Sequence, residues 1–127
     1  MPPIKRFEDV LAWQEARKLT KNIYATTNRE PFARDFGLRD QIQRASVSAM
    51  SNVAEGFDCE SKMEFGRFLG IARRSATEVQ SLLYVALDVS YIDVMTFEQQ
   101  YEQARKTKAL IGGFKMSLTR RALGMDT

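Results

Sequence analysis

The stretch Ser61–Ser90, SKMEFGRFLGIARRSATEVQSLLYVALDVS, decides the fold of this 127-residue chain. It begins with a capping box, in which the side chains of Ser61 and Glu64 can each satisfy a backbone N–H that the first helical turn leaves free. Apolar residues then recur at steps of three and four, the spacing of one face of an α-helix. No glycine or proline interrupts its Val- and Leu-rich second half. We therefore predict one long helix over residues 62–90, and not a strand.

Three further helices are predicted on either side of this one. Prolines occur only at positions 2, 3 and 31, so nothing in the later chain obliges a helix to break. Residues 7–26 carry an apolar stripe at helical period, and residues 35–55 begin at a good N-cap residue, Asp35. A second capping box, Thr96 to Gln99, predicts the start of a helix over residues 97–122.

Short connections between long helices are typical of an antiparallel up-down-up-down four-helix bundle. We predict that residues 1–127 form this all-α fold as a single domain, with no linker and no internal repeat. Gly56 is predicted to cap the second helix at its C-terminal end. Gly66 and Gly70 are predicted to allow close helix approach, and Gly112 and Gly113 to mark a bend or a crowded crossing. Neither pair is predicted to form a phosphate loop, because both lack its spacing and its strand-turn-helix setting.

Composition narrows the class of protein. Hydrophobic residues make up 44% and charged residues 28% of the chain, as in globular proteins. No apolar run approaches the ~20 residues of a membrane span, and Glu8 and Asp9 interrupt the segment where a signal peptide would need an apolar core. We expect a cytoplasmic protein with no membrane association. Cys59 is the single cysteine, so no intramolecular disulfide forms.

Catalytic chemistry is poorly supported by the residue types present. The chain has no histidine, which removes the commonest general base and metal ligand. A single thiol cannot build a Cys/His metal site, and the acidic residues do not form the Glu-x-x-His pairs of di-iron bundles. The serines have no well-placed activating base. We expect no enzyme activity, no metal and no cofactor.

A polar stripe follows the second predicted helix. Its members recur at helical steps and are Gln41, Arg44, Ser48, Ser51, Asn52 and Glu55. The third helix carries a similar polar seam of Arg73, Arg74, Ser75, Glu78 and Ser81. One hypothesis is that these two seams meet in a partly buried network that fixes helix register and subunit contacts. The alternative is that each seam is a solvated face. The proposed network consists of Arg44, Asn52, Glu55, Arg74, Ser75 and Glu78.

Charge is segregated along the chain, although the net charge is only +3. Residues 35–60 are mainly acidic, whereas residues 105–121 contain six basic and no acidic residues. Such a basic segment can attract phosphates without reading base sequence, and an oligomer would multiply it into a continuous surface. The candidate nucleic-acid-binding residues are Arg105, Lys106, Lys108, Lys115, Arg120 and Arg121. An ordinary solvated helix face is the alternative interpretation.

Four blocks of the sequence occur in a specific order: FEDVLAWQEARKLTKNIY (Phe7–Tyr24), LRDQIQRASVSAMSNVAEG (Leu38–Gly56), SKMEFGRFLGIARRSATEVQSLL (Ser61–Leu83) and YI (Tyr91-Ile92). This ordered set resembles the bacterial four-helix-bundle proteins first noticed in intervening sequences of large-subunit ribosomal RNA genes. The resemblance extends to about residue 115. It departs at Met50, where the family commonly has a proline.

The resemblance implies a bundle that assembles into a ring-like homo-oligomer, a pentamer, similar to the accessory protein of diversity-generating retroelements. That protein binds nucleic acid and a reverse transcriptase, so RNA or DNA and a protein of this kind are the partners it implies. Two hypotheses follow for the present chain: an oligomer that binds nucleic acid through its basic surface, or a protein-interaction scaffold with no direct nucleic-acid role. Steep salt dependence of binding would distinguish the first from the second.

Overall fold

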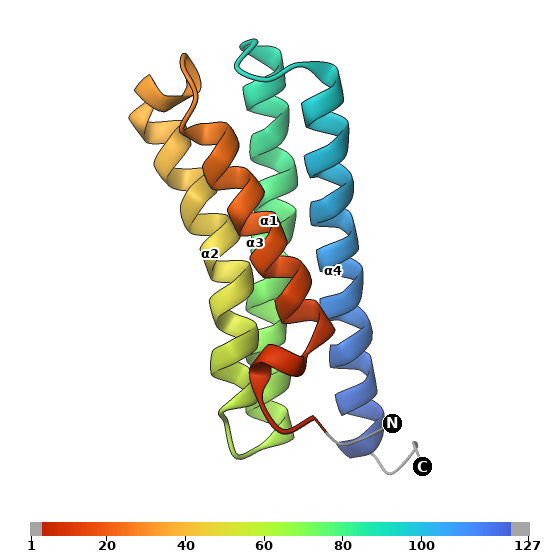
Figure 1. The fold of residues 1–127 in the computed structure, drawn as a ribbon. Helices are drawn as coiled ribbons and strands as arrows, with labels where there is room; N and C mark the ends of the chain where they lie inside the picture. Colours follow the sequence, from red (N-terminus) through yellow and green to blue (C-terminus); the bar gives the residue numbers. More distant parts are fainter. Residues whose placement is uncertain (1–3, 123–127) are drawn as a thin grey trace.

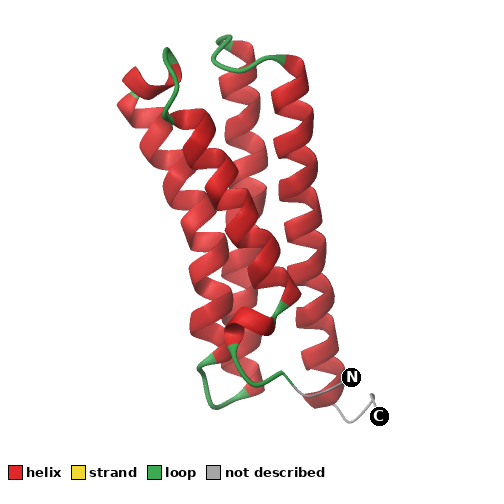
Figure 2. Cartoon of the chain, in the orientation of Figure 1, coloured by secondary structure: helices red, strands yellow, loops and turns green. Residues whose placement is uncertain are grey.

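A computed structural model of the chain describes residues 4–122, including the side chains of residues 4–120. Its four long helices are α1 (Leu11–Thr27), α2 (Phe36–Phe57), α3 (Lys62–Asp88) and α4 (Val94–Ala122). Two short 3-10 turns, η1 (Phe7–Asp9) and η2 (Phe32–Arg34), precede α1 and α2. Residues 4–122 contain no strand (Figure 2), so the prediction of an all-α chain with four long helices is confirmed.

The four helices lie side by side in an elongated bundle (Figure 1). α2 packs against α1 and α3, while α4 packs against α3 and α1. The α1–α2 and α3–α4 connections lie at one end of the bundle, and the α2–α3 connection lies at the other. α1 crosses obliquely, so that it lies beside α2 at the first end and beside α4 at the second. Among the described residues, none of these helices combines the length and apolarity needed to cross a membrane.

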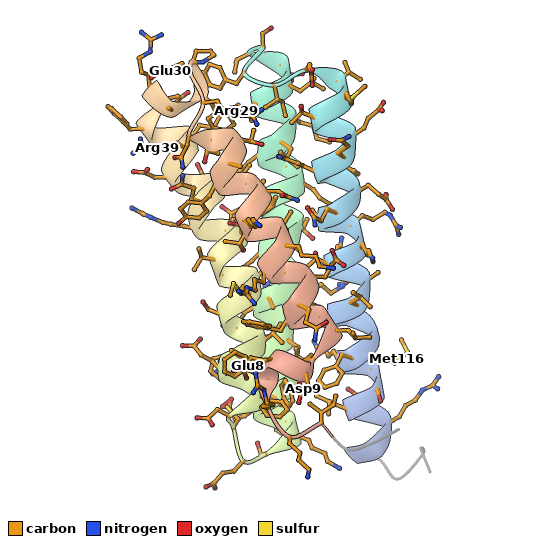
Figure 3. All side chains as sticks on the ribbon, in the orientation of Figure 1. Glu8, Asp9, Arg29, Glu30, Arg39 and Met116 are labelled. Carbon is orange, nitrogen blue, oxygen red and sulfur yellow. The ribbon has the colours of Figure 1, made fainter. Side chains whose placement is uncertain are left out.

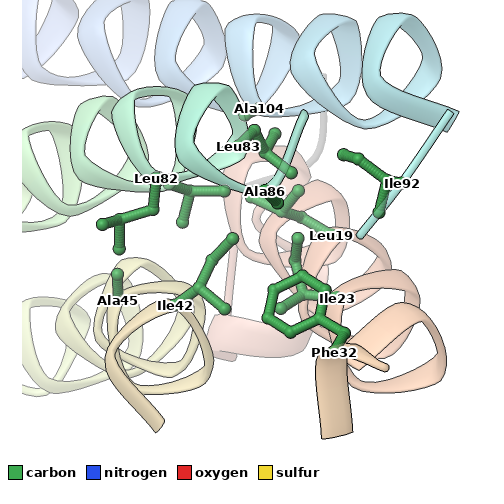
Figure 4. Close-up of a cluster of buried hydrophobic side chains, with 11 residues drawn as sticks. Leu19, Ile23, Phe32, Ile42, Ala45, Leu82, Leu83, Ala86, Ile92 and Ala104 are labelled. Carbon is green, nitrogen blue, oxygen red and sulfur yellow. The ribbon is translucent and has the colours of Figure 1, made fainter. Parts of the chain in front are cut away.

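Two apolar clusters fill the interior. The first lies near the α1–α2 and α3–α4 connections, where Phe32 and Ile92 close the end of the bundle over Leu19, Ile23 and Leu83 (Figure 4). The second cluster lies toward the α2–α3 connection and contains Trp13, Phe65, Leu69 and Ile111, among others. Full burial of an aliphatic or aromatic side chain of this size stabilises the fold by about 1.5–3 kcal/mol. These contacts, and not local propensity, supply most of the helical stability.

Local capping explains where α2 and α3 begin. The Asp35 side chain accepts a hydrogen bond from Leu38 N at 3.1 Å, so the predicted N-cap of α2 is confirmed. Ser61 accepts from Glu64 N at 3.0 Å, as predicted for α3. Glu64 instead accepts from Arg67 Nε at 2.9 Å, on the helix surface. The predicted capping box is therefore present only in its serine half.

Two helix starts differ from the prediction. α1 begins at Leu11 and not at Phe7, because residues 7–9 form the separate turn η1. α4 begins at Val94, and the Asp93 side chain accepts from Thr96 N at 2.8 Å. Hydrogen bonds from the side chain and the backbone of Thr96 hold the pKa of Asp93 below its ordinary value. The prediction that Thr96 opens the helix is wrong, because the helix starts one turn earlier, where Asp93 accepts the hydrogen bond from Thr96 N.

The glycines have different roles from those predicted. Gly56 lies within α2, which continues to Phe57, and a Cβ there would lie 2.8 Å from Phe65 Cδ1 and 2.9 Å from Phe68 Cβ. Gly56 therefore permits close approach of α2 and α3 and is not a cap. Gly66 and Gly113 face open space, so the predicted close helix approach at Gly66 and the predicted crowded crossing at Gly113 are wrong.

Candidate nucleic-acid interface

The main surface concavity lies between α3 and α4 and has a volume of about 690 Å³. We call it the α3–α4 groove. Four cationic side chains line it, and no carboxylate does. Its lining residues are Arg73, Arg105, Lys108, Ala109, Gly112, Gly113, Lys115, Met116 and Thr119.

Helical periodicity places the α4 members of this set on one face. Lys108, Gly112, Lys115 and Thr119 follow one another at steps of three and four residues, so they form a continuous stripe along the helix. Gly112 lowers the floor of the groove at its middle. Met116 is exposed and projects away from α4 at the edge of the groove (Figure 3).

Cations from each helix lie over a glycine of the other. A Cβ at Gly112 of α4 would lie 3.5 Å from Arg73 Nε of α3, and a Cβ at Gly70 of α3 would lie 3.2 Å from Lys115 Nζ of α4. Arg74 Nη1 lies 3.6 Å from the same Gly70 position. Gly70 and Gly112 therefore do allow a close approach between α3 and α4. In each case a side chain of one helix lies over the backbone of the other.

The six basic residues singled out in the sequence do not share one surface. Arg105, Lys108 and Lys115 line the groove, and Arg120 is exposed further along α4. The Arg121 side chain lies outside the described residues.

Lys106 is directed toward α1 and not into the groove. Its ammonium lies 3.2 Å from Glu15 Oε1, and Glu15 is only 7% exposed. Gln103 donates to Glu15 Oε2 at 3.3 Å. Burial opposes ionisation of Glu15, but these hydrogen bonds and the nearby lysine charges outweigh it and lower its pKa. Lys106 therefore does not line the α3–α4 groove, and its charge neutralises a buried carboxylate between α1 and α4.

Arg105 lines the groove, but its guanidinium group already forms a salt bridge with a carboxylate. Glu102, one turn earlier on α4, accepts from Arg105 Nε at 2.8 Å and from Arg105 Nη2 at 2.5 Å. The hydrogen bonds raise the pKa of Arg105 and lower that of Glu102. The cations of the groove without a carboxylate partner among the described residues are therefore Arg73, Lys108 and Lys115.

Arg73 was not among the candidates for nucleic-acid binding. Its helical spacing placed it instead in the polar seam of the third helix. The sequence did contain an indication that Arg73 is unpaired. No acidic residue lies three or four positions after Arg73, where a salt-bridge partner on the same helix would stand.

A second concavity of about 470 Å³ continues the groove toward the α2–α3 connection. It shares Lys115 and Thr119 with the α3–α4 groove and adds the exposed residues Lys62, Met63 and Arg67. Arg67 is paired with Glu64. The basic surface therefore extends along the outer side of α3 and α4, with methionine side chains beside it.

Another basic concavity lies over α1 and has a volume of about 490 Å³. Arg17, Lys18 and Lys21 contribute to it, but Glu8 also lines it and pairs with Arg6 at 3.3 Å. This surface therefore offers a less uniform positive potential than the α3–α4 groove.

The predicted polar network between the second and third helices differs in composition. Ser48 and Ser75 share a hydrogen bond of 2.7 Å between their hydroxyl oxygens, and Asn52 donates to Ser48 Oγ at 3.0 Å. Gln41 donates to Glu78 at 3.3 Å. These contacts join the two seams through hydroxyl and amide side chains, with Glu78 as the one charged group that takes part.

The charged members of that network do not take part as expected. Arg44, Glu55 and Arg74 are exposed, and none of them forms a salt bridge within the described part of the chain. An exposed charge remains solvated by water, whereas burial would cost desolvation energy that the pair must offset. Ser48, which was on the stripe but not in the proposed set, is the centre of the contacts that form.

Four long helices and a basic groove with no carboxylate in its lining define an all-α protein with a positively charged surface between α3 and α4. The sequence matches the family described as 23S rRNA-intervening sequence protein over residues 8–113. The chain belongs to this family, as the resemblance in its four sequence blocks predicted. Lys115 and Arg120 lie beyond the matched segment.

A solved structure shares the fold. It is a protein of unknown function from the S23 ribosomal protein family of Bacteroides thetaiotaomicron, with a TM-score of 0.76 and 20% sequence identity. The alignment covers 83% of this chain and 98% of that protein. No functionally curated protein matches the sequence.

Proposed function

We propose that this chain is a non-enzymatic protein that binds RNA or DNA through the phosphate backbone, using the α3–α4 groove. The observation that carries the proposal is the meeting of four cationic side chains with no carboxylate in the lining. Phosphate contacts of this kind supply affinity without base specificity, because every nucleotide offers the same charge.

The lining of the groove also favours backbone contacts over base contacts. Sequence-tolerant binding of single strands through bases uses exposed aromatic rings on which the bases stack. The groove residues include none: apart from its cations, the groove is lined by glycine, alanine, methionine and threonine. The expected ligand is therefore held by its phosphates, and affinity falls steeply as salt is added.

We further propose that an antiparallel four-helix subunit assembles into a homo-oligomeric ring, as the family resemblance implies. Support comes from apolar side chains left uncovered on the outer face of α3: Tyr84, Val85 and Val89 are 49%, 44% and 49% exposed. Apolar residues gathered in this way mark interaction surfaces. A ring would repeat the groove and increase avidity for a long nucleic acid.

The test is binding of labelled RNA and DNA at about 50 and 200 mM salt, a range over which several phosphate contacts change affinity strongly. One variant replaces Arg73, Lys108 and Lys115 by Ala. The matched control replaces Arg17, Lys18 and Lys21 of α1 by Ala, which removes the same charge from another surface. Circular dichroism establishes that both variants remain helical.

We expect salt-dependent binding that the groove variant loses and the control retains, with the slope of log affinity against log salt reduced by about 2–3. Loss in the control alone would place the interface on α1 and overturn the proposal. An assembled parent protein that binds neither RNA nor DNA at low salt would instead favour the scaffold hypothesis.

A further inference from the structure

Around Gly70, cationic side chains from α3 and α4 approach the same point. Lys115 extends from α4 across to α3, where its Nζ lies 3.2 Å from the point that a Gly70 Cβ would occupy. Arg74 Nη1 approaches the same point to 3.6 Å. The two cationic nitrogens, one from each helix, are therefore within about 7 Å of each other, close enough for like charges to repel.

The surroundings do not compensate this repulsion. Arg73, Arg74 and Lys115 form no salt bridge with any carboxylate of the described residues. Arg73 of α3 lies over Gly112 of α4, with Nε 3.5 Å from the Cβ position there, and it lines the same groove as Lys115. An anion bound beside these uncompensated cations would relieve the repulsion.

Glycine at position 70 leaves the room that this arrangement uses. Gly70 is buried beneath the Lys115 ammonium, so the cation rests on the helix backbone and not on a side chain. A methyl group at 3.2 Å would displace the ammonium outward by a few tenths of an ångström or more. Gly66, one turn earlier on α3, has nothing within 4 Å of its Cβ position and provides the comparison.

We propose that Arg73, Arg74 and Lys115, arranged over Gly70 and Gly112, form a discrete phosphate-binding site. The ligand group is a phosphate, carried either by a nucleic-acid backbone or by a small molecule such as pyrophosphate. The first source rests on the proposed nucleic-acid function, whereas the second does not. Guanidinium groups provide paired N–H donors to phosphate oxygens, and the lysine provides a point charge.

The experiment measures pyrophosphate binding by calorimetry, and RNA binding by anisotropy, for the full chain and two variants. Gly70→Ala is expected to weaken pyrophosphate binding about tenfold, the effect of losing one charge-assisted hydrogen bond. Gly66→Ala is expected to bind pyrophosphate as the parent does. Both alanines favour the helix, so thermal unfolding separates any loss of fold from a loss of binding.

A third variant tests the same site without a substitution at Gly70, where the added methyl group could rearrange the helix. Lys115→Met keeps a side chain of similar length across Gly70 and removes its charge, so it is expected to reproduce the loss seen in Gly70→Ala. The site is refuted by absence of pyrophosphate binding, or by equal binding in parent, Gly70→Ala and Lys115→Met.

The pyrophosphate and RNA measurements distinguish a discrete phosphate site from a general nucleic-acid interface. Salt-dependent RNA binding that Gly70→Ala leaves unchanged would retain a diffuse basic interface and overturn the discrete site. Pyrophosphate binding that both substitutions weaken, in a protein that binds neither RNA nor DNA, would support the site for a small phosphate ligand and overturn the nucleic-acid proposal.

Discussion

At the scale of single residues, Ser90 shows how α3 stops. Its φ of 65° lies in the left-handed region, which non-glycine residues adopt at a cost. Ser90 N donates to Leu87 O at 3.0 Å, and Tyr91 N donates to Ala86 O at 2.8 Å. This pair of hydrogen bonds is the Schellman arrangement, whose left-handed position is usually glycine.

Ser90→Gly is therefore expected to stabilise the protein by about 0.5–1 kcal/mol, because glycine adopts positive φ without steric cost. Urea denaturation followed by circular dichroism measures the change. Ser81→Gly is the control: Ser81 is exposed in the middle of α3, where glycine costs about 0.5–1 kcal/mol. A destabilising effect of Ser90→Gly would show that the serine side chain contributes more than the backbone strain costs.

Glu15 makes stability depend on pH. Its pKa in the folded protein lies below the ordinary value of 4.5, because donors from α4 outweigh the cost of burial. A depressed folded pKa stabilises the fold above the unfolded pKa, and that contribution is lost as pH falls through the folded pKa. We expect Glu15→Gln to be less stable than the parent by about 1 kcal/mol at pH 7. The difference should shrink below pH 4.5, and a difference that is constant with pH would contradict this.

Lys106→Ala separates structure from binding within the basic segment. It removes the cation that faces buried Glu15, so it is expected to destabilise the fold by about 1–2 kcal/mol. Its effect on RNA affinity should be small beside that of Lys115→Ala, because Lys106 does not line the α3–α4 groove. Equal losses of affinity in the two variants, both folded, would place Lys106 at the interface after all.

At the scale of elements, the glycines of α2 and α3 set how closely the helices pack. A Cβ at Gly56 would meet Phe65 and Phe68 at less than 3 Å, and both rings belong to the facing helix. Phe68 Cβ is bonded to the backbone, so it cannot move away without moving α3, and the Phe65 ring could move only by leaving its packed position. Gly66 has no such neighbour.

Gly56→Ala is expected to destabilise the protein by about 1–2 kcal/mol, because overpacking exceeds the gain in helix propensity. Gly66→Ala is expected to raise stability by up to about 1 kcal/mol, since alanine favours the helix and meets no atom. Thermal unfolding of the two variants and the parent measures both. Stabilisation by Gly56→Ala would mean that α2 and α3 separate at little cost.

At the scale of the whole molecule, the connections bring distant segments together at one end of the bundle. Asp35, before α2, accepts a hydrogen bond from the Tyr91 hydroxyl at 2.9 Å as well as from Leu38 N. The contact raises the pKa of Tyr91. It ties the α1–α2 connection to the α3–α4 connection at the same end of the bundle (Figure 1).

The proposed assembly predicts that the parent has a solution mass several times its chain mass of 14.5 kDa. Val85→Glu with Val89→Glu is expected to reduce that mass, because two charges on an apolar interface must be desolvated. Light scattering coupled to size exclusion measures it. Arg17→Glu with Lys21→Glu, on the exposed face of α1, is the matched control. A monomeric parent, or an assembly unaffected by the α3 variant, would contradict the proposed surface.

By itself, the sequence determined the all-α class, the four helices and two of their N-caps. These depend on apolar spacing and on side chains that bond within three or four residues of their own position, as Asp35 and Ser61 do. The start of α4 was misplaced because Thr96 and Asp93 both resemble caps, and the hydrogen bond of Asp93 decides between them.

Only the tertiary structure decided which charges share a surface. Arg105 and Lys106 are neighbours in sequence, yet one lines the groove and the other contacts α1, because successive residues lie about 100° apart around a helix. Arg73 joins Lys115 from another helix only because α3 and α4 pack at one particular rotation and register. That rotation depends on burial of apolar faces such as Leu69 and Ile111, and no spacing within a single helix contains it.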